Sequence, residues 1–350
     1  SAGGDPLYVE DVFSTYLYDG TGAVKTITNG IDLDGEGGVV WIKDRSGTEK
    51  HVLAYDENKF LSSNTTDAVT TNVNYVQSFN SDGFQVGAAS PVTASGSTFA
   101  SWTFRKAEKF FDVVTYTGTG VARTIAHNLG SVPGCMIIKR TDTATNWYIY
   151  HIGITTPQGH EILFTTGQAD TNTNIWNNTV PTDSVFSIGT GASFYDWNAS
   201  GGTYVAYLFA SDAGGFGDDG DENIIKCGSY TGNGGSSVNS VTVGFEPQWI
   251  LVKNVTAAGS WAMYDTMRGW GVSANSSDDA RLFANSSGAE SLGNAFNPTA
   301  TGFEFQLNNA TWNNSGNNFI YIAIRRPMKT PTAGTEVYTT IARAGNNVTT

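Results

Sequence analysis

The sequence predicts an all-β protein made of three tandem antiparallel β-sandwich domains of the jelly-roll or lectin-like kind. The prediction rests on a landmark series that occurs three times, on short apolar runs between turn residues, and on composition. Of the 350 residues, 41 are glycine, 12% are aromatic and only 15% are charged. This profile is typical of sandwiches and barrels rather than of helical or disordered proteins.

The landmark series contains a Tyr-x-Gly-x-Gly turn, an apolar strand that ends in lysine, a Ser-Gly turn and a last apolar strand. Each lysine is followed at the same spacing by a ring side chain: Lys43 by His51, Lys139 by Trp147, and Lys253 by Trp261. Lys43 to Lys139 spans 96 residues and Lys139 to Lys253 spans 114. A repeat of this length has the size of a domain, so we expect three small domains, each with its own core.

The positions of the three copies along the chain predict the bounds of six segments. These are an N-terminal segment (1–9), a first sandwich (10–109), a second sandwich (110–212), an acidic glycine-rich linker (213–222), a third sandwich (223–331) and a C-terminal tail (332–350). The linker is expected to be a flexible, solvated hinge, because four glycines and four acidic residues stand close together in it.

Strands are predicted in the second copy at 112–117, 121–126, 134–141, 146–152, 160–166, 183–189 and 203–210, with glycine, proline or asparagine between most of them. The last strand of each copy alternates, which predicts core-facing sets. These sets are Ala100, Trp102 and Phe104; Val205, Tyr207 and Phe209; and Ile320, Ile322 and Ile324. The Gly-x-Gly pairs are predicted to form turns that need a positive φ.

Charge and cysteine usage exclude several classes. The net charge of −13, with 19 basic and 32 acidic residues, argues against a nucleic-acid partner. The apolar runs are much shorter than the ~20 residues that a membrane-spanning helix needs, so no membrane insertion is expected. Cys135 and Cys227 stand at non-equivalent points of the copies, which favours two separate buried thiols over the alternative of a disulfide.

Motifs of catalysis are incomplete in this chain. The Gly-x-Gly pairs lack the third glycine and the helix of a dinucleotide fingerprint, and His160-Glu161 is not completed to HExxH because position 164 is Phe164. The E-x-D-x-x-E strand of lectin-fold glucanases does not occur either. We therefore predict no enzyme, no catalytic residue, no cofactor and no metal; a calcium site at Asp218, Asp219 and Asp221 of the linker is the alternative to a solvated hinge.

Two tryptophans are the candidate ligand-binding residues. Trp197 and Trp312 precede the Ser-Gly turn in asparagine-rich loops, where copy one has Val92. An exposed indole in such a loop can stack on a sugar ring. The alternative is that both tryptophans cap the end of a sandwich.

Several phrases resemble proteins of tailed bacteriophages, particularly marine phages. They are TYLYDGTG with TITNGIDL and VVWIK, FDVVTYTGTG with TIAHNLGSVPG and IIKR, and SGGTYVAYLFA with GGFGDDGDENIIKCGSYTGNG. The resemblance covers almost the whole of 8–331. It implies a tail-fibre, lectin-like or other virion-surface protein, and it carries over no functional residue.

The expected function is therefore a non-enzymatic structural or adhesion protein at the virion surface, either a tail fibre or a capsid-surface fibre or decoration protein. Its expected partners are other virion proteins, further copies of itself as a homotrimer, and host surface glycans. A secreted bacterial carbohydrate-binding adhesin is the alternative, and a lectin-fold glycoside hydrolase is the second alternative.

Overall fold

The computed structural model is an all-β protein, as the sequence predicts. It describes residues 5–190, 197–271, 279–293, 296–305 and 312–330, so the predicted tail lies outside the described residues. Helical structure in the described part is limited to single turns: α1 (Val9–Val12), α2 (Ser90–Thr93), η1 (Pro157–Gly159) and η2 (Thr266–Arg268). None of these is long and apolar enough to cross a membrane.

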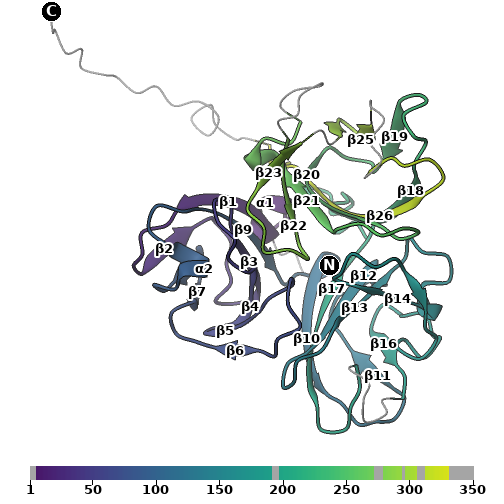
Figure 1. Cartoon of the computed structure of the whole chain (residues 1–350), viewed down its shortest axis with the longest axis horizontal. Helices are drawn as coiled ribbons and strands as arrows, with labels where there is room; N and C mark the ends of the chain where they lie inside the picture. Colours follow the sequence, from purple (N-terminus) through teal and green to yellow (C-terminus); the bar gives the residue numbers. More distant parts are fainter. Residues whose placement is uncertain (1–4, 191–196, 272–278, 294–295, 306–311, 331–350) are drawn as a thin grey trace, which may run out of the picture.

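The strands form three lobes, which we call units 1, 2 and 3 (Figure 1). Unit 1 has a larger sheet in the order β1 (Phe13–Asp19), β9 (Thr98–Arg105), β3 (Gly38–Asp44), β4 (Val52–Asp56), β5 (Lys59–Leu61) and β6 (Thr70–Thr71). Its smaller sheet has the order β2 (Lys25–Thr28), β8 (Gly83–Val86) and β7 (Val76–Asn80). Pairing is antiparallel in both sheets.

Unit 2 repeats this strand order. Its larger sheet runs β10 (Phe111–Thr117), β17 (Thr203–Phe209), β12 (Cys135–Arg140), β13 (Trp147–His151), β14 (His160–Leu163) and β15 (Asp170–Thr171). Its smaller sheet pairs β11 (Arg123–Ala126) with β16 (Val185–Ile188). The strands predicted for the second copy all occur, with ends displaced by a few residues.

Unit 3 has the order once more. Its larger sheet runs β18 (Ile225–Thr231), β26 (Asn318–Arg325), β20 (Pro247–Asn254), β21 (Ala262–Asp265), β22 (Asp279–Phe283) and β23 (Ser291–Gly293). Its smaller sheet runs β19 (Asn239–Thr242), β25 (Gly302–Phe305) and β24 (Asn297–Thr299). The landmark lysines are equivalent, because Lys43, Lys139 and Lys253 pair with Ala100, Val205 and Ile320 of the neighbouring strands β9, β17 and β26.

The Tyr-x-Gly-x-Gly turn packs against the loop before the last strand of its own unit. The tyrosine hydroxyl donates to a carbonyl of that loop: Tyr18 to Val92 (2.7 Å), Tyr116 to Trp197 (2.8 Å) and Tyr230 to Trp312 (2.9 Å). The first glycine approaches the same loop so closely that a Cβ on Gly118 would lie 2.2 Å from the Ala199 carbonyl oxygen. The second glycine, Gly120, has φ +76°, so both glycines of the motif are required.

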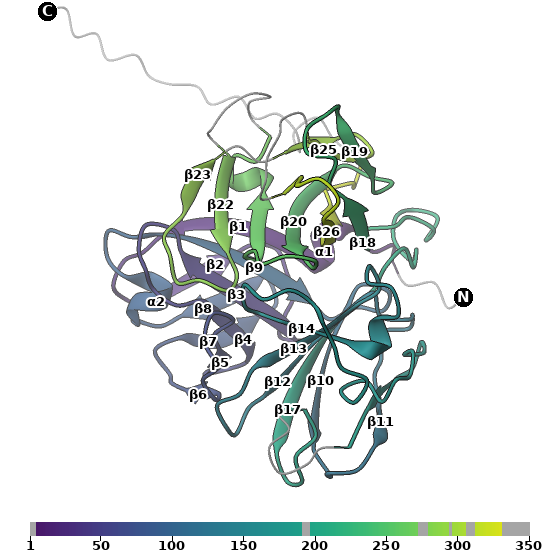
Figure 2. The ribbon, with the colours of Figure 1, turned by 45° about the vertical axis from the view of Figure 1, so that its right-hand side comes forward.

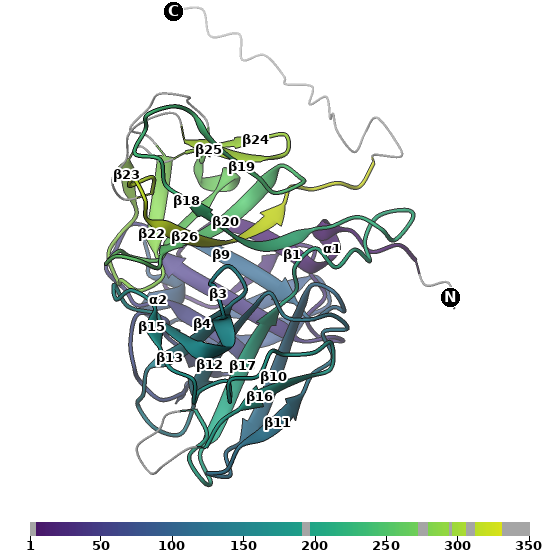
Figure 3. The same cartoon turned by 90° about the vertical axis from the view of Figure 1, so that its right-hand side faces the viewer.

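Both faces of each larger sheet are buried. On β9, Phe99 packs in a core with the smaller sheet of unit 1, whereas Ala100, Trp102 and Phe104 face the centre of the molecule. The predicted sets of β17 and β26 join the same central core. The alternation correctly predicted that the residues of each set share one face of their strand, but a separate core was expected for each set. The structure corrects this, because the three sets pack between units, and the smaller sheets lie on the outside (Figures 1 and 3).

Phe164 stands at the centre of the shared core. Its ring centroid lies 6.2 Å from that of Trp41, 5.7 Å from Trp147 and 5.0 Å from Trp261, one tryptophan from each unit. The side chain is only 5% exposed. Phe164 therefore marks an approximate threefold axis. Figure 2 shows the three units from a second direction.

Hydrogen bonds of equivalent side chains link the units in a cycle. Trp147 Nε1 of unit 2 donates to Thr65 O of unit 1 (3.0 Å), Trp261 Nε1 of unit 3 donates to Leu163 O of unit 2 (2.8 Å), and His51 Nε2 of unit 1 lies 3.1 Å from Phe283 O of unit 3. Backbone bonds follow the same cycle, from Val69 N to Thr141 O, Ala169 N to Val255 O and Glu290 N to Arg45 O. The contacts are head-to-tail and they close into a ring.

One equivalent position carries a different side chain at each joint between units. The Tyr55 ring of unit 1 lies 6.4 Å from Tyr207 of unit 2, His151 of unit 2 donates to Tyr321 O of unit 3, and Asp265 of unit 3 accepts from Trp102 of unit 1. The first contact is aromatic, the second is a neutral hydrogen bond and the third involves a carboxylate. The joints are thus alike in geometry and different in chemistry.

The joint between units 3 and 1 contains buried charges. The Arg268 guanidinium, with a fully buried side chain, donates to Asp265 (2.6 Å) and to Glu290 (3.1 Å). Trp102 Nε1 donates to Asp265 at 3.0 Å, and Arg45 pairs with Glu290 at 2.7 Å. The Arg45–Glu290 pair and the Trp102–Asp265 bond cross the joint, whereas Arg268 binds both carboxylates from within unit 3. Removing Arg268 would leave the fully buried Asp265 carboxylate without its cation.

Two buried histidines at the joints use both ring nitrogens. His51 Nδ1 accepts from Trp41 Nε1 at 2.9 Å, and His151 Nδ1 accepts from a backbone N–H at 3.0 Å. Their Nε2 atoms donate to carbonyls of unit 3. Nδ1 must stay unprotonated to accept, and burial lowers the pKa of His51 to about 3 and that of His151 to about 4.

The central ring predicts the effect of Phe164→Ala. Removing a buried phenyl group at the axis should lower the free energy of unfolding by about 3–5 kcal/mol, measured by urea denaturation. Val180→Ala, at a side chain 55% exposed in the same unit, should change it by less than about 0.5 kcal/mol. Equal effects of the two substitutions would contradict the placement of Phe164.

The histidines predict an acid-sensitive fold. Below about pH 6.5 the unfolded chain protonates both imidazoles, whereas the folded chain keeps them neutral, so the unfolded state binds more protons. The free energy of unfolding should therefore fall from pH 6.5 to pH 5 by up to about 1.4 kcal/mol per pH unit for each histidine. Denaturation of the double variant His51→Gln, His151→Gln should show most of this slope removed; an unchanged slope would refute the assignment.

Candidate functional site

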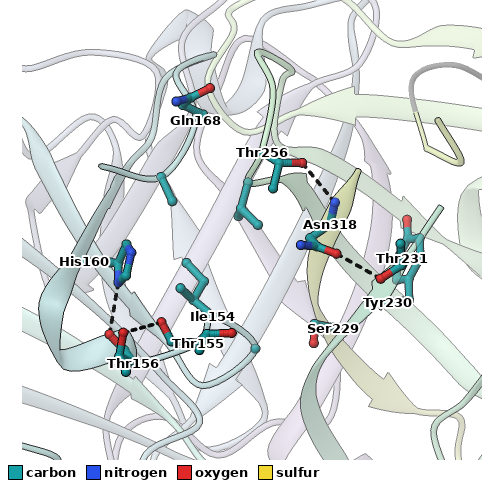
Figure 4. A pocket seen from close by; sticks show the side chains of 13 residues that line it. Ile154, Thr155, Thr156, His160, Gln168, Ser229, Tyr230, Thr231, Thr256 and Asn318 are labelled. Carbon is teal, nitrogen blue, oxygen red and sulfur yellow. Dashed lines mark hydrogen bonds between the residues drawn. The ribbon is translucent and has the colours of Figure 1, made fainter. Parts of the chain in front are cut away.

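A polar groove of about 640 Å³ lies between units 2 and 3. We call it the 2–3 groove, and Figure 4 shows its side chains. It is lined by Gly153, Ile154, Thr155, Thr156, His160, Gln168, Ala169, Ser229, Tyr230, Thr231, Val255, Thr256 and Asn318. The residues from 153 to 169 belong to unit 2 and the others to unit 3, so the groove exists only because the two units are joined.

The wall from unit 2 is the connection between β13 and β14. Thr156 has a left-handed backbone conformation with φ 53°, which turns the chain into η1. His160 begins β14, and its Nδ1 lies 3.0 Å from the Thr156 carbonyl oxygen. This bond fixes the ring at the edge of the groove, with Nε2 available to a ligand.

The wall from unit 3 is the edge strand β18 with the adjoining ends of β20 and β26. Along β18, Ser229 and Thr231 are exposed while Tyr230 is buried. Thr231 Oγ1 donates to Asn318 Oδ1 at 2.9 Å, and the Asn318 N–H donates to Thr256 Oγ1 at 3.0 Å. The first bond orients the Asn318 carboxamide, and the second, from the backbone N–H, holds the start of β26. The NH₂ group of Asn318 has no partner among the described residues.

The walls meet where the backbones of units 2 and 3 approach closely. Ala169 N donates to Val255 O at 3.0 Å across the joint. Gly153 lies so near unit 3 that a Cβ on it would stand 2.8 Å from Gly228 O and 3.0 Å from Ile320 Cγ2. Together with Ile154, these residues give the groove an apolar strip between its polar walls.

The chemistry of the lining is that of neutral hydrogen bonds. It offers hydroxyl groups, carboxamides and one imidazole, and it contains no Asp, Glu, Lys or Arg. No sequence motif singles out these residues, since they are common polar residues from two copies. One signal was present: the loop between β13 and β14 spans 152–159, whereas its counterpart in unit 1, between β4 and β5, spans only 57–58.

The predicted sugar platform is wrong. Trp197 and Trp312 are 2% and 1% exposed, and their rings pack edge-on against Tyr148 at 5.4 Å and Tyr264 at 6.0 Å. Their backbone carbonyls accept from the tyrosines of the Gly-x-Gly turns. The asparagine-rich loops suggested exposure, but each indole packs against a tyrosine of the larger sheet of its unit. The alternative interpretation, that the tryptophans cap their units, agrees with this packing.

The segment predicted as a flexible linker is a folded turn. Phe216 is 1% exposed, and its ring lies 6.4 Å from Phe110. Gly217 N donates to Leu7 O at 2.8 Å, and Glu222 pairs with Arg325. Among the described residues, no group of three or more acidic, histidine or cysteine side chains is placed to hold a metal ion.

The two cysteines are free and buried, as predicted. Burial raises the pKa of Cys135 and of Cys227 far above the usual range of a thiol. Cys227 Sγ lies 3.6 Å from the carbonyl oxygen of Ala210. Both side chains therefore act as small core residues.

The close approach at Gly153 predicts that Gly153→Ala pushes units 2 and 3 apart. The added methyl group should lower the free energy of unfolding by about 1–3 kcal/mol, measured by urea denaturation. The matched control is Gly159→Ala in the same loop, where the nearest atoms lie 3.8 Å from the new Cβ. A loss no greater than that of the control would show that the units can separate freely at this point.

Comparisons with known proteins give a family but no named activity. No curated protein and no solved structure matches the chain. One family model matches residues 9–327 and so spans all three units. On this match, the chain belongs to the family described as a domain of unknown function, DUF7483.

Proposed function

We propose that this chain is a non-enzymatic structural or adhesion protein of a phage virion, exposed on the particle surface as a tail fibre or as a capsid-surface fibre or decoration protein. The observation that supports this most is the closed ring of three like units around Phe164. Such a ring buries the inner apolar faces of all three larger sheets. The resemblance of its repeats to tailed-phage proteins supplies the virion context.

We propose further that the units are three antiparallel sandwich domains of the jelly-roll or lectin-like kind, at 10–109, 110–212 and 223–331. The common order of the larger sheets supports this. So do the cores that units 1 and 3 build between a larger and a smaller sheet. The virion role does not depend on which named sandwich type applies.

The titratable groups with shifted pKa values favour a role in holding the ring together. Burial lowers the pKa of Lys43 and of Lys253 to about 8. Lys253 Nζ donates to Thr166 O of unit 2 at 3.2 Å, and Lys139 Nζ donates to Thr66 O of unit 1 at 3.1 Å. Lys139 and Lys253 thus bond a backbone carbonyl of a neighbouring unit, whereas Lys43 bonds Asp44 O and Gly47 O of its own unit. All three are structural uses of an amine rather than catalytic ones.

The partners that we propose are other virion proteins, further copies of this chain and host surface glycans. A homotrimer stays a prediction. The three units of a single chain already have an approximate threefold arrangement. One chain placed on the axis of a trimeric fibre would therefore match the symmetry of the fibre without further copies of this chain.

Purified particles test the proposal. Antibodies raised against the chain should label virions at one defined position, and mass spectrometry of the same particles should find the chain at a fixed copy number. Labelling of tails or of capsids would distinguish the two virion locations. Recovery of the chain only from a particle-free culture supernatant would overturn the proposal in favour of a secreted adhesin.

A further inference from the structure

We propose that the 2–3 groove binds a neutral oligosaccharide. This inference rests on the adhesive part of the proposed function and gives it a ligand class and a location. The site differs from the two buried tryptophans that the sequence indicated, and it lies between two units rather than at the tip of one.

The charge of the groove defines the ligand class. The chain carries 51 charged side chains, 19 basic and 32 acidic, yet the thirteen lining residues include none of them. A phosphate or carboxylate ligand would need arginine or lysine, and a metal ion would need carboxylates. A ligand rich in hydroxyl groups needs neither, because it is matched by neutral donors and acceptors.

Polar groups on both walls are available for such a ligand. Within the described part of the chain, no hydrogen-bond partner occurs for the side chains of Gln168 and Ser229, for the NH₂ group of Asn318 or for Nε2 of His160. They combine donors with acceptors, as vicinal hydroxyl groups of a sugar require. Figure 4 shows them distributed around the groove rather than gathered at one point.

The apolar strip supplies the second requirement. Ile154, Ala169 and Val255 also line the groove, and the backbones of the last two meet at the joint, so the C–H face of a sugar ring can cover these side chains. The volume of about 640 Å³ falls within the ~300–1,000 Å³ of small-ligand sites. The ring of Tyr230 is largely buried and its hydroxyl donates to Trp312 O, so strong aromatic stacking is not expected. A single groove should bind weakly, and display of many copies on a particle would raise retention.

An array of immobilised oligosaccharides tests the proposal with the full-length chain. The array carries neutral glucans, mannans and galactans beside sulfated and uronic-acid glycans. The chain should retain neutral glycans in preference to charged ones. Absence of retention on every neutral glycan, or retention of charged glycans alone, overturns the proposal.

Two variants locate the binding. Ser229→Trp places a bulky ring at an exposed position of the wall and should reduce retention at least tenfold, and Gln168→Ala should reduce it severalfold. The matched control is Thr115→Trp, because Thr115 of β10 is the counterpart of Ser229 of β18. Thr115 pairs with Val205 of β17, Ser229 pairs with the equivalent Ile320 of β26, and both side chains are exposed. An equal loss in Thr115→Trp and Ser229→Trp, with both variants folded by circular dichroism, overturns the location.

The edge strand β18 provides a competing outcome around Ser229, since an extended peptide can pair with a strand edge. Nearer its start, at Ile225 and Cys227, this edge is already bonded to Ser211 and Asp212. A library of immobilised peptides is therefore probed in parallel. Retention of peptides that is lost in Ser229→Trp, without retention of neutral glycans, would assign the groove to a protein partner and overturn the carbohydrate assignment. Particle labelling decides the virion role separately: labelled virions with no glycan retention would refute the groove proposal alone.

Discussion

The second apolar face of each larger sheet is the constraint on which this structure depends. A smaller sheet of two or three strands covers one face of the larger sheet, and the other face, with Trp102, Tyr207 or Ile322 at its middle, must be covered by the neighbouring units. The inner apolar faces of the three larger sheets are all shielded from water only when they pack against one another around a common axis. Phe164 fills that centre, and the cyclic order of the hydrogen bonds follows from it.

Burial on both faces explains why charge appears where it does. A joint that excludes water can contain a polar group only if the group is satisfied. The landmark lysines reach backbone carbonyls, the histidines are neutral and bonded at both nitrogens, and Arg268 is matched by Asp265 and Glu290. The joint between units 3 and 1 has no direct chain connection across it, and it contains the buried Arg268–Asp265 pair, whereas the ion pairs Lys106–Asp112 and Lys226–Asp212 at the other two joints are partly exposed.

The sequence predicted the strands, the equivalence of the copies and the residues that share a face, because these depend on local alternation and on turn glycines. It did not reveal what covers each face, since alternation shows that Phe99 and Trp102 are apolar without showing that they lie in different cores. Trp197 was misjudged for a similar reason: its neighbours in sequence are polar, but its indole packs against Tyr148 of β13, and its carbonyl accepts from Tyr116. The groove combines residues from two copies, which no single copy could indicate.

The three units belong to one polypeptide, and this has a consequence for how the joints between them can evolve. In an assembly of three identical chains, a substitution at an interface is made at every interface at once. Here Tyr55, His151 and Asp265 occupy equivalent positions of the three units, and each can be substituted without changing the other two. The interface between units 2 and 3 could therefore acquire a longer loop and open into a groove, while the ion pairs between units 3 and 1 were kept. In a triplicated chain, one joint can thus keep a buried ion-pair network while another is open as a groove.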